Sequence, residues 1–193
     1  MTGLAPGFAD PVHDAQAAFR GVLDALSTPG RIVTLAAPPA VPAPLMPATV
    51  ALCLTLVDYE TPLWLDGPAA AADGFLRFHC GCPIAAAPAD ARFAVVTDPL
   101  AMPGLHEFAP GEDLYPDRSA TLLVQVAGFG EGRALRLTGP GIRGSAELRV
   151  AGLPDGFAAA WTDNAALYPL GVDVVLVAGD RVVGLPRTVR MEG

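Results

Sequence analysis

The clearest pattern of hydrophobic and polar positions lies near the end of the chain. Val172–Ala178 is β-branched and apolar apart from one aspartate, a composition typical of a buried strand. Gly179-Asp180 follows and fits a type II′ turn, in which glycine occupies the first central position. Arg181–Leu185 then reads as the returning strand, and Pro186 ends it because proline has no N–H for the ladder. The pattern predicts a structural β-hairpin.

A second pattern, at helical spacing, follows a start signal close to the N-terminus. Asp10 can cap a helix through its carboxylate, and Pro11 suits the first helical position. The apolar residues that follow at the spacing of one helical face are Val12, Ala15, Phe19, Val22, Leu23 and Leu26. The Ser-Thr-Pro-Gly segment at 27–30 ends the pattern, so we predict an amphipathic helix with these side chains on its apolar face.

The rest of the chain alternates between short strands and helices. The expected strands are 31–35, 63–65, 92–97, 119–127, 133–138 and 146–150, and the expected helices are 48–57, 69–78 and 154–164. The glycines at 128, 130 and 132 precede a segment of period two, so we interpret them as a hairpin turn and not as a phosphate-binding loop. Helix-linked strands mixed with hairpins predict an α/β fold, a mixed sheet flanked by helices, in one domain spanning 1–193. The proline- and glycine-rich connection at 98–117 is either a functional loop or an interaction surface.

Residues 34–57 carry no charge and therefore need a test for a membrane span. The prolines within them exclude a continuous spanning helix, and the helix-compatible part, 48–57, is half of the roughly 20 residues that a bilayer requires. The N-terminus has neither a basic start nor an apolar run, so we expect no signal peptide. The three cysteines are then expected to be reduced thiols of a cytoplasmic protein without a membrane segment.

The composition narrows the classes of function. The chain is 52% hydrophobic and only 17% charged, which favours a buried interface with a protein partner. A formal net charge of −8 argues against a nucleic-acid partner. All 12 basic residues are arginine, and the absence of lysine excludes both Schiff-base catalysis and a Walker-type phosphate loop. Arginine can still hold a phosphate group in bidentate geometry.

The segment His79-Cys80-Gly81-Cys82 is the best metal candidate, with Cys53 as a further ligand. A structural zinc site usually combines two C-x-x-C-like pairs, whereas this chain has one short C-x-C pair. Buried reduced cysteines are therefore favoured, and a zinc protein is the minority hypothesis. No histidine stands in a recognisable nucleophile motif, which leaves no argument for a hydrolase.

The arginines are the remaining candidates for chemistry. Arg77 and His79 lie close together, and Arg133, Arg136 and Arg143 follow in the central strands. Arg133 and Arg136 are an odd number of residues apart, so a regular strand places them on opposite faces and disfavours one anion pocket built from both. We assign no catalytic or metal-binding residue and expect no cofactor; as substrate-binding or interface positions we single out Arg77, His79, Arg136 and Arg187.

Several segments together resemble a known family. DAQAAFRGVLDALSTPG, TPLWL, LRFH, TLLVQV, RALRLTGPGI and YPLGVDVVLVAGDRVVGLPRT are similar to the PhnH subunit family of the bacterial carbon–phosphorus lyase system. The matching segments appear in the family's order over nearly the whole chain. None of them is a catalytic signature, so the specificity of the resemblance comes from their number and order.

The resemblance implies a fold similar to the large domain of pyridoxal-phosphate-dependent transferases, without the cofactor. The absence of lysine, the residue that would bind pyridoxal phosphate, agrees with that loss. The resemblance also implies a homodimer when the protein is isolated, and assembly with the PhnG, PhnI and PhnJ subunits into a core complex, alongside the ATPase-like PhnL. It carries over no catalytic residue.

The leading hypothesis is a required, non-catalytic subunit of the carbon–phosphorus lyase core complex. The resemblance implies support for the conversion of ATP and an alkylphosphonate to ribose 1-alkylphosphonate 5-triphosphate and adenine, before the C–P bond is cleaved. The alternative is an independent small-molecule or nucleotide-binding enzyme with an arginine-lined pocket at a dimer interface. A third, weaker hypothesis is a zinc protein built on His79, Cys80 and Cys82.

Overall fold

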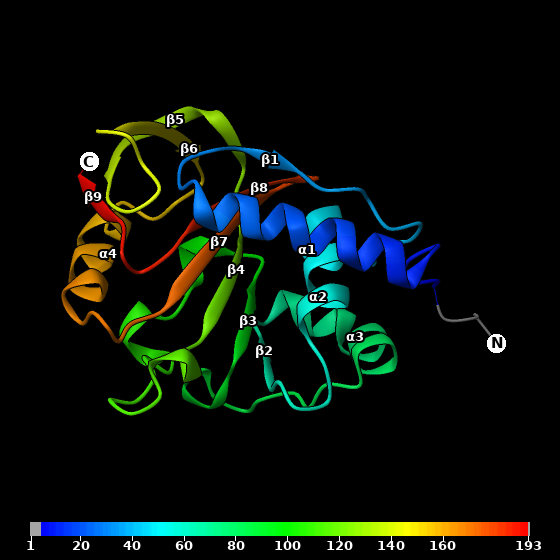
Figure 1. Ribbon diagram of the computed structural model, residues 1–193. Coiled ribbons are helices and arrows are strands. Elements are labelled where there is room, and N and C mark those ends of the chain that lie inside the picture. The colour runs from blue at the N-terminus through cyan, green and yellow to red at the C-terminus, as the bar shows by residue number, and fades with distance from the viewer. Residues whose placement is uncertain (1–4, 193) are drawn as a thin grey trace.

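The computed structural model describes residues 5–192 and is built on two sheets (Figure 1). The large sheet has the strand order β1-β8-β7-β4-β3-β2, and the small sheet has the order β6-β5-β9. The strands are β1 Val33–Thr34, β2 Leu63–Leu65, β3 Phe93–Val96, β4 Thr121–Gln125, β5 Gly128–Thr138, β6 Ala146–Ala151, β7 Asp173–Ala178, β8 Arg181–Leu185 and β9 Arg190–Glu192. The α-helices are α1 Pro11–Ser27, α2 Pro47–Leu56, α3 Asp73–Cys80 and α4 Phe157–Ala166. The short 3-10 helices are Pro68–Ala72, Pro88–Asp90, Pro99–Ala101, Leu105–Glu107 and Pro116–Arg118.

The large sheet is mixed, as the order of elements predicted. β2, β3, β4 and β7 pair in parallel, whereas β8 pairs antiparallel with both β7 and β1. Alternate residues of β7 enter opposite cores: Val174 packs toward α4 and the small sheet, and Val175 packs toward α1, α2 and α3. The molecule is therefore layered, with helices on one face of the large sheet and with α4 and the small sheet on the other. The prediction of an α/β fold with a mixed sheet and helices is confirmed.

The terminal hairpin forms where the sequence placed it. Ala178 of β7 lies opposite Arg181 of β8, which leaves Gly179 and Asp180 as the turn. Gly179 has a φ of 67°, whereas the φ of Asp180 is not positive, because among the described residues only glycines have a positive φ. A positive φ at the first central residue only is the type II′ combination. β7 and β8 occupy the interior of the large sheet, so the hairpin is part of the core.

The first helix begins as expected, but its predicted apolar face is only partly buried. The Asp10 carboxylate accepts hydrogen bonds from the backbone N–H of Val12 and His13, and the His13 contacts lower the pKa of this carboxyl. The large side chains Phe19 and Leu23 are 46% and 49% exposed, and the buried residues of α1 are Ala18, Val22 and Ala25.

The reason for this rotation of α1 is its close approach to β8. A Cβ atom at Gly184 would lie 2.7 Å from the backbone of Ala25, so the helix backbone rests almost directly on the strand. Such an approach admits only small residues at the contact, and the larger apolar side chains of the same helix turn outward.

The glycine-rich segment differs from the prediction. Residues 128–132 are not a hairpin turn, because β4 and β5 belong to different sheets. They form the first part of β5, where the register against β6 shifts between Phe129 and Arg133. Gly132 has a φ of 82°, and a Cβ there would lie 2.4 Å from the carbonyl oxygen of Val150. The segment is therefore a bulged strand, and glycine is required by the close approach of β6.

Two other elements have different bounds from those expected. The predicted helix at 69–78 is divided into the 3-10 helix Pro68–Ala72 and α3, and the last helix runs to Ala166. Over residues 5–192 no helix is both long enough and apolar enough to cross a membrane.

Candidate functional site

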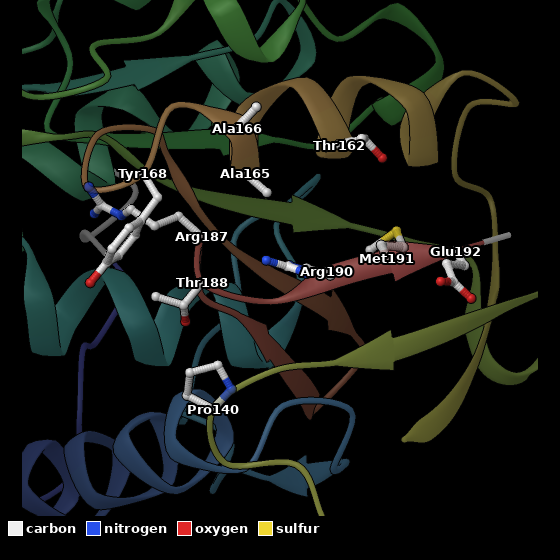
Figure 2. A pocket seen from close by; sticks show the side chains of 10 residues that line it. All are labelled: Pro140, Thr162, Ala165, Ala166, Tyr168, Arg187, Thr188, Arg190, Met191 and Glu192. Atoms are coloured by element: carbon white, nitrogen blue, oxygen red, sulfur yellow. The ribbon is translucent and has the colours of Figure 1, made fainter. Parts of the chain in front are cut away.

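A cavity of the described chain lies between α4 and β9 (Figure 2). It has a volume of about 720 Å³, is open to solvent and is lined by Pro140, Thr162, Ala165, Ala166, Tyr168, Arg187, Thr188, Arg190, Met191 and Glu192. A neighbouring cavity of about 320 Å³ is lined by Arg133, Asp155, Ala158, Ala159, Thr162, Met191 and Glu192. Thr162, Met191 and Glu192 line both cavities, so the two cavities are neighbours, and we call them together the α4–β9 groove.

Two buried side chains of α4 fix the groove in place. Trp161 is fully buried and its indole Nε1 donates to the carbonyl oxygen of Val189 at 2.8 Å, just before β9. Asn164 accepts from the backbone N–H of Val172 at 2.8 Å and donates to its carbonyl at 2.9 Å. These contacts join α4 to the segments at both ends of the hairpin. They leave the small side chains of Thr162 and Ala165 facing the groove.

Arg187 lies at one end of the groove, but its guanidinium is already bonded. Nε and Nη2 donate to the Asp173 carboxylate, at 3.1 and 2.5 Å respectively, and Nη2 also donates to the Ser119 hydroxyl. Nη1 donates to the carbonyl oxygens of Pro116 at 3.0 Å and Pro169 at 3.5 Å.

The side chains of Arg187 and Asp173 are only 13% and 23% exposed. With its N–H donors used in this way, Arg187 joins the 98–117 connection to β7 and to the chain after α4. It has little capacity left for a phosphate.

The other predicted site residues do not gather at this groove. Arg136 lies on the exposed face of the small sheet, opposite Glu147 on one side and Glu192 on the other. Arg77 pairs with Asp73 on the surface of α3 at 2.5 Å.

His79 is also on α3, and its Nε2 lies 2.9 Å from the carbonyl oxygen of Ala5. α3 is at the end of the molecule opposite to α4 and β9 (Figure 1). The structure therefore divides the four positions among three places, and their roles stay predictions.

The three cysteines lie together between α2 and the end of α3, and all are free thiols. Cys80 Sγ lies 3.5 Å from the carbonyl oxygen of Cys53, and burial raises the pKa of Cys53 to about 12. The pKa of Cys82 is lowered by a hydrogen bond from Cys80. His79 is turned toward Ala5, and residues 5–192 contain no group of three or more His, Cys, Asp or Glu side chains able to hold a metal.

Two buried polar residues at the ends of parallel strands were not recognised from the sequence. Asp66, after β2, accepts from the backbone N–H of Thr97 at 2.5 Å and from that of Asp98 at 2.9 Å. Gln125, the last residue of β4, accepts from the backbone N–H of Met46 at 2.6 Å and the hydroxyl of Thr49 at 2.8 Å.

Within the described part of the chain, every buried side-chain nitrogen or oxygen has a hydrogen-bond partner. These polar groups hold the fold and present no unpaired atom to a ligand.

Two groups stand out among the exposed large apolar side chains. The first is beside the groove and comprises Leu114, Tyr115, Leu167 and Tyr168, with exposed fractions of 83%, 46%, 47% and 64%. These residues flank Pro116 and Pro169, whose carbonyls both bind Arg187, so the two segments are neighbours. The second is the outer face of α1, with Val12, Phe19 and Leu23. Where exposed apolar side chains form a large contiguous patch, the patch is a common mark of an interaction site.

Comparison with known proteins gives consistent matches along the chain. Residues 6–192 match a family model described as bacterial phosphonate metabolism protein (PhnH). The chain is 42% identical over 188 residues to the alpha-D-ribose 1-methylphosphonate 5-triphosphate synthase subunit PhnH of Rhizobium meliloti (strain 1021), covering 96% of this chain and 94% of that protein. It is 37% identical over 175 residues to the putative C-P lyase subunit protein HtxG of Stutzerimonas stutzeri, covering 90% and 83%.

Proposed function

The chain belongs to the PhnH family of bacterial phosphonate metabolism proteins, and from this we propose that it is a required, non-catalytic subunit of the carbon–phosphorus lyase core complex. In this role it supports the conversion of ATP and an alkylphosphonate to ribose 1-alkylphosphonate 5-triphosphate and adenine, which precedes cleavage of the C–P bond. The observation that carries the proposal is the match to two proteins that are each named as subunits, over 94% of one and 83% of the other.

The geometry of the site supports a role in binding other proteins. Arg187, the least exposed arginine that lines the groove, is bonded to Asp173, Ser119 and backbone carbonyls, so it is not available as a substrate clamp. One group of exposed Leu and Tyr side chains flanks the groove, and a second group of exposed Val, Phe and Leu side chains lies apart from it on α1. Aromatic and large aliphatic side chains of this kind are the usual anchors of protein–protein interfaces.

The proposal includes partners, compartment and architecture. We propose PhnG, PhnI and PhnJ as partners in the core, with PhnL alongside, and a homodimer in the isolated protein. Three free thiols fit the reducing cytoplasm. We also propose that 1–193 is a single domain whose fold is similar to the large domain of pyridoxal-phosphate-dependent transferases without the cofactor; superposition on such a domain tests this.

Co-expression with the other core subunits tests the function. Only this chain carries an affinity tag, placed at its N-terminus, and the polypeptides that co-elute are quantified. We expect PhnG, PhnI and PhnJ to be recovered in fixed proportion to the tagged chain. Recovery of the tagged chain alone, while the others are demonstrably soluble, contradicts the proposal.

One observation favours a second candidate function. Arg187 and Arg190 both line the 720 Å³ cavity, which is large enough for a nucleotide-sized ligand. Calorimetric titration of the isolated protein with ATP and with methylphosphonate tests this directly. Binding that is lost in Arg190→Ala favours an independent small-molecule protein, and no heat of binding at millimolar ligand excludes it.

A further inference from the structure

The outer edge of β9 is open. β9 is the last strand of the small sheet, and among residues 5–192 only β5 pairs with it. The pairing covers Arg136–Thr138, so it occupies one edge of β9 and leaves the other unpaired. An edge strand presents a row of backbone N–H and C=O groups that can pair with another chain. This is the chemistry that recognises an extended polypeptide.

The α4–β9 groove lies along this open edge. Its wall on the α4 side is made of Thr162, Ala165 and Ala166, with Ala158 and Ala159 farther along. Strands in a sheet are spaced about 4.8 Å apart, so a neighbour of β9 must come close to this wall. The α4 side chains of this wall are small, and Figure 2 shows the space between them and β9.

The side chains of β9 give the edge a charge pattern. Met191 is buried in the core, whereas Arg190 and Glu192 are exposed and share the opposite face of the strand. Neither Arg190 nor Glu192 forms an ion pair with another described residue. Residues directly opposite each other in neighbouring strands interact, and opposite charges stabilise the pair. An incoming strand with an acidic residue and a basic residue two positions apart therefore matches β9.

We propose that an extended segment of another core subunit adds to β9 as a fourth strand of the small sheet and lies in the α4–β9 groove. Its acidic and basic residues pair with Arg190 and Glu192, and its apolar side chains contact Leu167 and Tyr168 at the end of the groove. This inference rests on the proposed function, because it names the surface through which the chain enters the complex. Backbone pairing provides affinity in such strand addition, and the side chains provide register.

Thr162 offers the sharpest substitution, because it lines both parts of the groove and is exposed on α4. Thr162→Trp fills the groove without entering the core. The matched control is Asp163→Trp, which adds the same side chain at the next position of α4, where the residue is exposed and lines neither cavity. Thr162→Ala is a second control that keeps the groove open.

We expect Thr162→Trp to weaken the recovery of the core subunits by about tenfold or more, and both controls to recover them as the wild type does. Hydrogen exchange of the wild-type protein gives an independent measurement that needs no variant. The backbone amides of 190–192 are expected to exchange more slowly in the core complex than in the isolated chain.

The outcomes separate this inference from the proposed function. If the wild-type chain recovers no other subunit, the function and the inference both fail. Suppose instead that the wild-type chain and Thr162→Trp recover the other subunits equally, and that the β9 amides exchange at an unchanged rate. Then β9 is only a short edge protected by its charges, and the inference alone is overturned. If Thr162→Trp dissociates a homodimer but leaves the core complex intact, the groove holds a second copy of this chain, which also overturns the proposal.

Discussion

The Arg187 side chain forms hydrogen bonds with four residues from three segments of the chain. It joins Asp173 of β7 to Pro116 of the 98–117 connection, to Ser119 just before β4 and to Pro169 after α4. The ion pair is mostly buried, so the loss of one partner leaves an unpaired charge with reduced access to water. The planar guanidinium is essential to this arrangement because an ammonium group cannot bond in so many directions.

We therefore expect Arg187→Ala to lower the free energy of unfolding by about 3 kcal/mol, and Arg187→Lys to restore only part of it. Urea denaturation followed by circular dichroism measures the change. Arg136→Ala is the control, because Arg136 is exposed and forms no ion pair within residues 5–192; its effect should stay within about 0.5 kcal/mol. A loss at Arg187 as small as that at Arg136 contradicts the structural role.

Cys53 is expected to make the protein less stable at alkaline pH. Its pKa in the folded protein is about 12, above its ordinary value of 9.0, because burial disfavours the thiolate. The folded chain holds this proton where the unfolded chain releases it. The contribution to stability is therefore complete below pH 9 and is lost as the pH rises toward 12.

Between pH 9 and pH 11 we expect this thiol to reduce the free energy of unfolding by up to about 1.4 kcal/mol per pH unit. The measurement compares the pH dependence of the wild type with that of Cys53→Ala. The variant is less stable at neutral pH, because a buried side chain is shortened, but its stability should fall less steeply above pH 9. Parallel curves for the two proteins contradict the assignment.

At the scale of elements, the contact between α1 and β8 sets the position of the first helix. A Cβ at Gly184 would meet the carbonyl carbon and oxygen of Ala25 and the nitrogen of Leu26 at 2.7 Å. These are backbone atoms, so no side chain can move aside to make room. The lack of a side chain at Gly184 therefore allows α1 to lie close to the sheet. The buried residues of α1, Ala18, Val22 and Ala25, are small enough for this short helix–strand distance.

We expect Gly184→Ala to destabilise the protein by about 1–3 kcal/mol, because the helix must shift away from β8. Thermal unfolding measures the effect. Gly74→Ala is the matched control: a Cβ at this position in α3 meets nothing within 4 Å, so alanine is expected to be neutral or slightly stabilising. A neutral Gly184→Ala variant shows that α1 has room to move.

At the scale of the whole molecule, one sheet serves two cores. Leu122 and Val124 of β4 face the core of α4 and the small sheet, whereas Leu123 faces the core of the three N-terminal helices. If the central strands unfold, the apolar side chains of both cores are exposed to water. The two cores are thus expected to unfold together.

The test follows each core with its own probe. The two tryptophans, Trp161 and Trp64, pack in the core under α4 and report on it through their fluorescence. The buried thiols of Cys53 and Cys82 report on the other core through their accessibility to a thiol reagent. We expect both probes to give the same midpoint in a urea titration, as in a two-state transition. Two separate midpoints contradict a single domain spanning 1–193.

The sequence predicted the elements that depend on local chemistry. The hairpin turn at Gly179 and the cap at Asp10 formed as expected, because a glycine with positive φ and a capping carboxylate act within a few residues. The direction of the α1 face was missed because it is set by Gly184, which lies far away in the sequence. The glycines of β5 were misassigned for a similar reason, since the strand that requires them, β6, comes later in the chain.

The candidate site was less accessible to sequence reasoning. Arg187 was selected as a binding residue, but its partners come from three distant segments and no spacing pattern reports them. The wall of the groove on the α4 side is formed by Ala and Thr side chains that carry no chemical signature. The one usable signal in the sequence was the apolar pair Leu167 and Tyr168, which follows the last turn of α4 and is exposed in the structure.

The position of β9 has a practical consequence for anyone who produces this protein. Glu192 lines the α4–β9 groove, and a peptide fused directly after Gly193 starts two positions beyond it. Such a tag can lie in the groove as an intramolecular competitor at high effective concentration. The start of α1 lies at the other end of the molecule (Figure 1), so a tag attached before it is remote from the groove. The choice of cloning vector thus decides whether a purification reports the natural associations of the chain or suppresses them.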